Sequence, residues 1–258
     1  MNPLSLAPTT VPDAEPLVFI DAAIAAGCDS IGLRVHRSPG LPFHVVVGNA
    51  PLIREMQHRL SAANLPVLDL FTFYLQPECD FDGFTRALEL GATFGARYAL
   101  VQGDDPQWAR LVDTFGRFCA LAAPLGIAAI VEFNPARPLA TLSQAQQLLA
   151  ATPQRNTAIC VDPLHLARSG SAPEAVRNVD PHHLPYAQFS DGSLAPYARL
   201  LPGEGTLPLK ALLNVLPADI TLSVEVPKPN DANRSNDFTP IDWCRHVMNV
   251  TRAYLANA

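Results

Sequence analysis

Two kinds of apolar segment alternate along the chain. Short runs rich in aliphatic residues, such as residues 128–133, have the length and composition of buried strands. Longer stretches carry apolar residues at helical spacing, as residues 52–63 do. This pattern predicts strands over residues 4–6, 30–35, 66–74, 98–102, 128–133, 157–161, 186–190 and 221–226. It predicts helices over residues 17–26, 52–63, 81–95, 107–125, 141–151, 173–178, 207–216 and 240–255.

Alternation of strand and helix indicates a parallel sheet with helices packed outside it. Eight such units in about 250 residues match the size of a (β/α)8 TIM barrel. We therefore expect a single α/β domain of this kind over residues 1–258, since no linker or composition shift divides the chain. A doubly wound open sheet is the alternative, but the sequence has neither a G-x-G-x-x-G motif nor a Walker loop to favour it.

Composition narrows the classes of partner. Charged residues make up 16% of the chain, against a usual share of about 25%. The net charge of -6 argues against a nucleic acid partner, and no run approaches the ~18 apolar residues of a membrane-spanning helix. The five cysteines are scattered and form no C-x-x-C pair, so we expect buried thiols in a protein of the reducing cytoplasm.

Four polar residues follow apolar runs at the ends of consecutive predicted strands. They are Glu132, Asp162, Gln188 and Glu225, at intervals of 30, 26 and 37 residues. Prolines at positions 135, 163 and 227 mark where three of these strands stop. The active sites of TIM barrels lie at the carboxyl ends of the strands. We therefore expect the four side chains to converge at the mouth of the barrel.

Three carboxylates and an amide at one point repel one another unless a positive charge neutralises them. A divalent cation is the simplest neutralising group, and an oxygen-rich donor set favours Mn²⁺ or Mg²⁺, with Co²⁺ or Zn²⁺ as substitutes. The alternative is a structural network of ion pairs. One carboxylate at a strand end is weak support for a metal, whereas four polar residues in successive units are stronger support.

The second half of the chain carries a further pattern, formed by Glu132, Asp162 with His165 three residues on, Gln188 three residues before Asp191, Glu225, and the segment Arg199-Leu-Leu-Pro-Gly-Glu-Gly205. This pattern resembles the xylose isomerase-like barrels of the sugar phosphate isomerase/epimerase superfamily. The resemblance spans roughly residues 15–255 and is only topological in the first half.

The resemblance implies one metal ion held by Glu132, Asp162, Gln188 and Glu225. In the family, His is the commonest residue at the position of Gln188. A Gln at this position looks like the variant found in the hydroxypyruvate isomerase-like and dehydroshikimate dehydratase-like branches, and the carbonyl oxygen of its side chain still binds a metal. Family members often pair through their barrel helices, so the resemblance makes a homodimer one candidate assembly.

The implied chemistry begins with removal of a proton from the carbon beside a substrate carbonyl. A metal ion on the carbonyl and the adjacent hydroxyl acidifies that C–H bond and stabilises the enediolate. By resemblance, Glu132 and Glu225 are also the acid/base pair. The expected enzyme is therefore a metal-dependent isomerase or epimerase of a small sugar or hydroxy-keto compound. A lyase of the 3-dehydroshikimate dehydratase type is the alternative, because loss of a β-hydroxyl uses the same site.

Two further residues are expected to touch the substrate by resemblance. His165 contacts substrate oxygens or acts as acid/base, unless it is a loop histidine bonded to backbone. Arg199 reaches a substrate hydroxyl, unless it forms an outward salt bridge. Asp191 is expected to orient Arg199 or a neighbouring backbone amide.

Three residues of the first half are candidates for the mouth of the barrel by position alone. Arg34 and Gln102 follow strands, where they line the mouth or cap the strands, and Tyr74 walls the pocket or packs in the core. Only two lysines occur in the chain, and no Gly-rich phosphate cradle follows the later strands, so we expect a substrate without phosphate.

Two other classes of protein fit less well. A barrel endonuclease that repairs DNA and binds several zinc ions needs more than the seven histidines present, and a basic face. A non-catalytic sugar-binding barrel has no need of the strand-end carboxylates.

Overall fold

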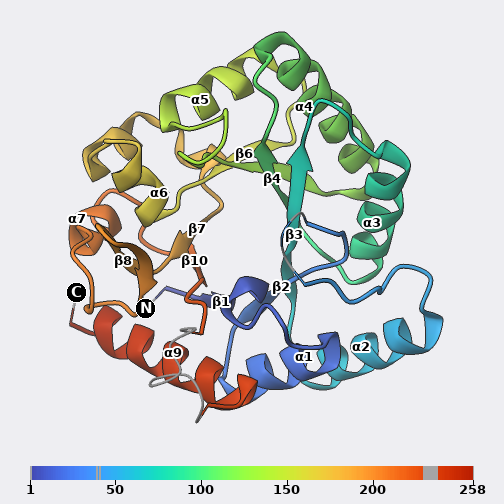
Figure 1. The fold of residues 1–258 in the computed structure, drawn as a ribbon. Coiled ribbons are helices and arrows are strands. Elements are labelled where there is room, and N and C mark those ends of the chain that lie inside the picture. The colour runs from blue at the N-terminus through green and yellow to red at the C-terminus, as the bar shows by residue number, and fades with distance from the viewer. Residues whose placement is uncertain (1, 39, 41, 229–237, 258) are drawn as a thin grey trace.

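The strands form a nearly closed parallel barrel, seen along its axis in Figure 1. The computed structural model describes residues 2–38, 40, 42–228 and 238–257. The strands run side by side in the order β6-β5-β4-β3-β2-β1-β10-β7, and a parallel bridge between Val161 and Ala187 joins the two edges. Their bounds are β1 Leu4–Leu6, β2 Ser30–Leu33, β3 Val67–Leu75, β4 Tyr98–Gly103, β5 Ala128–Glu132, β6 Thr157–Cys160, β7 Tyr186–Phe189 and β10 Thr221–Val224. The predicted TIM barrel is confirmed, and the open sheet is excluded.

The helices form a ring outside the barrel (Figure 1). The last helix packs beside the first, which brings the two ends of the chain together. Thr141 begins one helix with a capping box, in which Gln144 returns a hydrogen bond to the backbone. The helices are α1 Pro16–Ala25, α2 Ala50–Ala62, α3 Phe81–Thr93, α4 Trp108–Ala122, α5 Leu142–Ala151, α6 Pro163–Arg168, α7 Leu209–Leu213 and α9 Pro240–Leu255.

Side chains alternate between the two faces of the barrel wall. Those facing outward form the main apolar core with the helices. Those facing inward form a second cluster, which contains Phe71, Leu100, Ile130 and Tyr186. One carboxyl group, Asp69, is fully buried beside this inner cluster. The inner cluster closes the barrel beneath the mouth.

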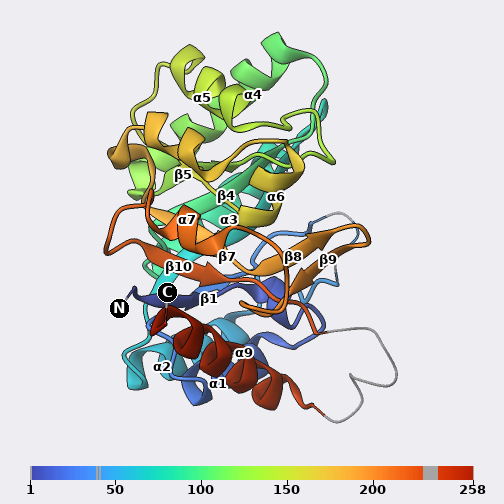
Figure 2. The ribbon, with the colours of Figure 1, turned by 90° about the vertical axis from the view of Figure 1, so that its left-hand side faces the viewer.

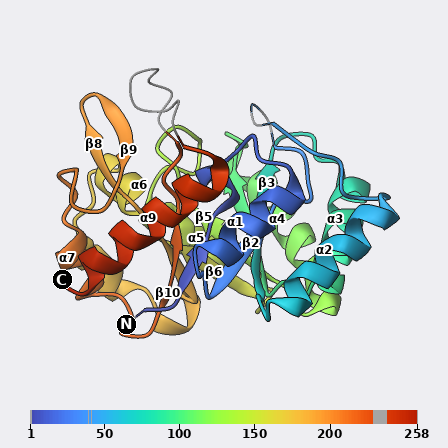
Figure 3. The same ribbon diagram turned by 90° about the horizontal axis from the view of Figure 1, so that it is seen from below.

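Two elements were not predicted from the sequence. The short helix α6 begins directly after Asp162, where we expected only a loop. An antiparallel hairpin, β8 (Asp191–Leu194) with β9 (Tyr197–Leu200), follows β7 before the chain returns to α7. Figures 2 and 3 show this hairpin projecting from the end of the barrel opposite the N-terminus. The predicted helix over residues 173–178 is a 3-10 helix, η3 (Pro173–Asn178).

Two general expectations can be compared with the structure. The five cysteines are free thiols, three of them buried. Among the described residues, no helix has the length and apolar character needed to cross a membrane.

Candidate metal and active site

The four predicted strand-end residues all lie in the buried interior at the carboxyl ends of their strands. Glu132 ends β5, Asp162 follows β6, Gln188 lies in β7 and Glu225 follows β10. Their exposed fractions are 3%, 0%, 0% and 8%. Strand alternation turns each of them inward, because their immediate neighbours in the chain pack in the outer core. Each of the four residues therefore lies at the strand end predicted for it.

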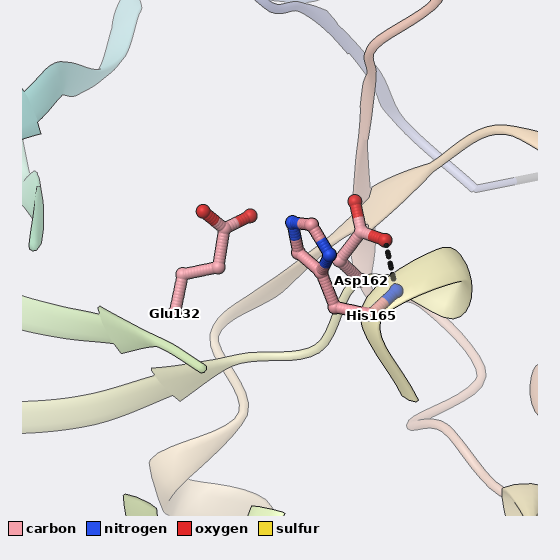
Figure 4. A group of neighbouring side chains, drawn as sticks. All are labelled: Glu132, Asp162 and His165. Carbon is pink, nitrogen blue, oxygen red and sulfur yellow. Dashed lines mark hydrogen bonds between the residues drawn. The ribbon is translucent and has the colours of Figure 1, made fainter. Parts of the chain in front are cut away.

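Three of the side chains at the mouth form a compact group. Glu132, Asp162 and His165 each offer a ligand atom, and these atoms lie within 4.8 Å of one another. Figure 4 shows the three side chains converging from β5 and from the start of α6. One oxygen of Asp162 caps α6 by accepting hydrogen bonds from the backbone N–H groups of Leu164 at 2.8 Å and His165 at 2.9 Å. This cap turns His165 back toward the mouth, so His165 is a helix residue and not a loop histidine.

Arg199 of β9 reaches into this group from the hairpin. Its Nη1 lies 2.6 Å from Asp162 Oδ2, and its Nη2 lies 3.5 Å from Glu225 Oε2. Nη1 also donates a hydrogen bond to the Ser190 hydroxyl at 3.0 Å. The side chain of Arg199 is only 11% exposed, so it points inward and not to solvent. The ion-pair network considered as an alternative to a metal is thus present at two of the three carboxylates.

Other polar atoms at the mouth form no contact with Arg199 and have no other partner. Among the described residues, Glu132 Oε1 and both amide atoms of Gln188 are buried and accept or donate no hydrogen bond. Buried polar atoms of native proteins nearly always have a partner, so unsatisfied oxygens at one point indicate a missing one. Carboxylate and amide oxygens are what a hard divalent cation binds. The residues present therefore fit the predicted ion, and His165 adds a nitrogen donor beside them.

Burial and mutual repulsion shift the acidity of the group. Burial, followed by the charges of Glu225 and Asp162, raises the pKa of Glu132 well above its ordinary value. Burial likewise raises the pKa of Glu225, although Arg199 acts against it. Burial acts to raise the pKa of Asp162, but the positive charge of Arg199, together with the charge of His165 and the hydrogen bonds from His165 and Arg199, outweighs burial and holds that pKa below its usual value. Burial lowers the pKa of His165 to about 4, so the imidazole is neutral at pH 7.

The candidates from the first half of the chain lie around this centre. Gln102 Nε2 donates a short hydrogen bond to Glu132 Oε2, which fixes the orientation of that carboxyl group. Tyr74 is half-buried, and the charges of Glu132 and Glu225 help to raise its pKa after burial itself. Arg34 lies beyond β2, and Glu225 is the largest of the charges that oppose the lowering of its pKa by burial. All three therefore lie close to the mouth.

Asp191 organises the backbone that carries Arg199. Its carboxylate accepts hydrogen bonds from the N–H groups of Gly192 at 2.8 Å, Gly203 at 3.0 Å and Leu207 at 3.0 Å. Of the two roles expected for Asp191, the structure shows the contact with backbone amides. Gly205 packs against the same carboxylate, since an added Cβ would lie 2.2 Å from Asp191 Oδ1. Only glycine allows this approach.

Two residues near the site were missed in the sequence. Ser190 accepts a hydrogen bond from Arg199, and nothing in the strand pattern distinguishes this serine from others. The guanidinium of Arg137 lies 4.9 Å from the centre of the Tyr74 ring and pairs with Asp104 at 3.1 Å. Arg137 follows β5 by five residues, and loops after barrel strands line the mouth. That rule was the available signal for Arg137.

Comparison with known proteins identifies relatives of this arrangement. Residues 20–253 match the family model described as "Xylose isomerase-like TIM barrel". Among solved structures, a probable 3-DHS dehydratase, AsbF of Bacillus anthracis, superposes with a TM-score of 0.76 at 17% identity, covering 98% of this chain and 99% of that one. D-Psicose 3-epimerase of Clostridium cellulolyticum H10 gives a TM-score of 0.70 at 12% identity and covers 98% of each chain.

A third structure bears on the metal. The IolI protein, solved with a bound zinc atom, superposes with a TM-score of 0.75 at 16% identity, covering 99% of this chain and 97% of that one. At these identities the superpositions show a shared fold. No curated protein sequence matches the chain.

Proposed function

The chain belongs to the xylose isomerase-like TIM-barrel family, and from this membership we propose that it is a divalent-metal-dependent isomerase or epimerase. The substrate in this proposal is a small sugar or hydroxy-keto compound. The observation that carries the proposal is the pair of buried oxygens without partners on Glu132 and Gln188, beside the group of Glu132, Asp162 and His165. Metal binding by the IolI structure supports the cofactor.

The proposed ligands are Glu132, Asp162, Gln188 and Glu225, with Mn²⁺ or Mg²⁺ as the ion. When bound, such an ion polarises a substrate carbonyl and stabilises negative charge on oxygen. The remaining chemistry belongs to the side chains. One of the two glutamates takes the proton from the carbon beside the carbonyl, and the other returns a proton to the neighbouring carbon or to the opposite face. A raised pKa suits both steps, because a carboxylate with a raised pKa is a stronger base toward the substrate proton.

The other mouth residues have positioning and binding roles in this proposal. Gln102 holds the carboxyl group of Glu132 in place through its hydrogen bond. Arg199 and neutral His165 present N–H groups to substrate oxygens, and Arg34 and Tyr74 complete the wall of the pocket. The buried position of these groups excludes water, which strengthens each electrostatic contact.

Replacement of either glutamate tests the proposal. We expect Glu132→Gln and Glu225→Gln each to lower turnover by about 10²–10⁴-fold, the usual contribution of a general acid or base. The bound metal, measured by mass spectrometry on the purified protein, is expected to fall as well. Glu89→Gln on the exposed face of α3 is the matched control and should change neither quantity. Full turnover and full metal content in both site variants would refute the assignment.

A lyase reaction is the second candidate, because the probable 3-DHS dehydratase has the same fold. The two reactions differ in the fate of the substrate after proton removal. An isomerase or epimerase incorporates deuterium from D₂O at the carbon beside the carbonyl while the substrate keeps all its hydroxyls. A dehydratase releases water and forms a conjugated product that absorbs ultraviolet light. Proton NMR and absorbance on the same reaction separate them.

A further inference from the structure

Arg34 lies just beyond the end of β2 with its guanidinium held from one side only. Nη1 donates hydrogen bonds to the backbone carbonyls of Pro12 at 3.2 Å and Pro42 at 3.0 Å. Nε and Nη2 are buried and have no hydrogen-bond partner among the described residues. These two nitrogens form one edge of the planar guanidinium, so a whole buried edge of this half-buried arginine lacks a hydrogen-bond partner.

Arg199, the other arginine of the mouth, shows the carboxylate partners that a buried guanidinium ordinarily has. Arg199 pairs with the carboxylates of Asp162 and Glu225. Within the described part of the chain, no carboxylate lies within ion-pair distance of Arg34. A buried donor without a partner destabilises the protein, and a charged donor does so more strongly. An arginine keeps its charge at any physiological pH, so an anion from outside the protein is a matching partner for this edge of Arg34.

The shape of the free edge selects the kind of anion. Two parallel N–H groups match the two oxygens of a carboxylate, which is the bidentate geometry that favours arginine over lysine. A cavity of about 40 Å³ adjoins Arg34, and Pro12, Pro42 and His44 also line it. This volume exceeds the roughly 10–15 Å³ that one water molecule needs. Arg34 follows β2 and Glu225 follows β10, and both strands pair with β1, so the two residues lie at the same end of the barrel, two strands apart.

We propose that the Nε–Nη2 edge of Arg34 binds a carboxylate of the substrate, so that the substrate is a hydroxy-keto acid and not a neutral sugar. This inference rests on the proposed function for the reaction, but the carboxylate contact can be measured without it. Phosphate offers similar oxygens, but a phosphate site is usually built from several donors or a helix N-terminus, and Arg34 is a single arginine. Phosphate is therefore an arm of the test.

The first experiment measures binding alone, on protein stripped of metal with EDTA. The probes are D-glycerate and glycerol, which share a skeleton and differ by the carboxylate, together with inorganic phosphate. Calorimetry or ligand-observed NMR gives each affinity. The proteins are the wild type, Arg34→Gln, Arg34→Lys and, as control, Arg54→Gln on the exposed face of α2. Thermal unfolding of each variant checks that it is folded.

We expect Arg34→Gln to weaken glycerate binding by about 10- to 100-fold, the equivalent of one charge-assisted hydrogen-bonded pair. Glycerol binding should not change. Arg34→Lys keeps the charge but loses the fork, so a smaller loss is expected, and it serves as the test if the glutamine variant does not fold. Arg54→Gln should match the wild type. Equal glycerate affinity in wild type and both Arg34 variants, or tighter binding of phosphate than of glycerate, would overturn the inference.

The second experiment separates this inference from the reaction. Hydroxypyruvate and dihydroxyacetone differ only in a carboxylate that replaces a CH₂OH group, and deuterium exchange beside the carbonyl is followed for both on metal-loaded protein. Preferential exchange of hydroxypyruvate that Arg34→Gln abolishes supports both proposals. Equal exchange of both compounds, unaffected by the variant, overturns the carboxylate contact but not the reaction. Exchange of neither compound, with the glycerate result intact, counts against the reaction alone.

Discussion

Asp69 is a carboxyl group in the interior of the barrel, where it accepts a hydrogen bond from the Tyr186 hydroxyl at 2.6 Å. Its other oxygen has no partner among the described residues. Burial raises the pKa of Asp69 to about 7, and the hydrogen bond from Tyr186 only partly opposes this. The pKa of an aspartate in an unfolded chain is about 3.9. Between these values the folded protein keeps a proton that the unfolded chain has lost.

This difference predicts a pH dependence of stability. Because the folded state binds the extra proton, the free energy of unfolding falls as pH rises from about 4 to about 7, with a slope of up to about 1.4 kcal/mol per pH unit from this group. Asp69→Asn removes the titration, so its stability relative to the wild type should improve steadily from pH 5 to pH 7. Urea unfolding of both proteins at pH 5, 6 and 7 measures the slope. Parallel stability curves for the two proteins would contradict the prediction.

The directions of the mouth side chains were predictable at the level of single residues, but their partners were not. Alternation along a strand and the prolines after it were enough to turn Glu132 and Asp162 toward the mouth. The ion pair between Arg199 and Asp162 joins residues from two loops, and its geometry depends on how a hairpin folds back over the barrel. The periodicity of the sequence carries no information about that path.

At the scale of elements, the missed helix α6 and the hairpin β8–β9 have different causes. A six-residue helix is too short to show a helical period, and its signal was instead the Asp162 cap with Pro163 in the first turn. The hairpin spans residues Asp191–Leu200 with two exposed apolar residues at its tip, Leu194 and Tyr197. The strands of this hairpin therefore lack the regular alternation of apolar and polar residues that predicts a half-buried sheet.

The Asp191 carboxylate holds the ends of this hairpin segment together, which leads to a prediction about the whole element. Asp191→Ala leaves three backbone N–H groups without their partner, and we expect a loss of about 3 kcal/mol in the free energy of unfolding. Urea unfolding measures this loss. Relative to the wild type, backbone amide hydrogen exchange in Asp191→Ala should accelerate more in residues 191–207 than in the rest of the chain. Turnover should fall further than stability explains, because Arg199 lies within that segment.

A matched control exists in another aspartate that binds backbone. Asp180 accepts one hydrogen bond from the His182 N–H at 2.9 Å at an exposed 3-10 turn. Asp180→Ala should cost about 1 kcal/mol or less and leave turnover unchanged. If Asp191→Ala behaves like this control, the carboxylate does not organise the hairpin.

For the whole molecule, the architecture was the most predictable part. Alternating units predict a parallel sheet because parallel strands require helical crossovers, and eight units in about 250 residues match a closed barrel. Every predicted strand is present, with ends that differ by at most two residues. Closure of the barrel also determines which strand ends meet, and this is why four residues up to 93 positions apart were expected at one mouth.

Metal binding should stabilise the whole molecule by mass action. A ligand at 100 times its dissociation constant adds about 2.7 kcal/mol to the free energy of unfolding. For a chain of this size we expect Mn²⁺ to raise Tm by about 5–10 °C over the protein in EDTA. Differential scanning fluorimetry measures the shift. The double variant Glu132→Gln/Glu225→Gln should lose it, whereas Glu89→Gln should keep it. An equal shift in the double variant would place the ion elsewhere.

The position of the β8–β9 hairpin has a consequence for how such a barrel can be engineered. The hairpin adds no strand to the eight-stranded sheet, yet its second strand carries Arg199. Its tip residues Leu194 and Tyr197 are 52% and 49% exposed, so their replacement leaves the core untouched. The tip of the hairpin can therefore be exchanged or extended without disturbing the barrel, which makes it a suitable place to engineer new contacts above the mouth.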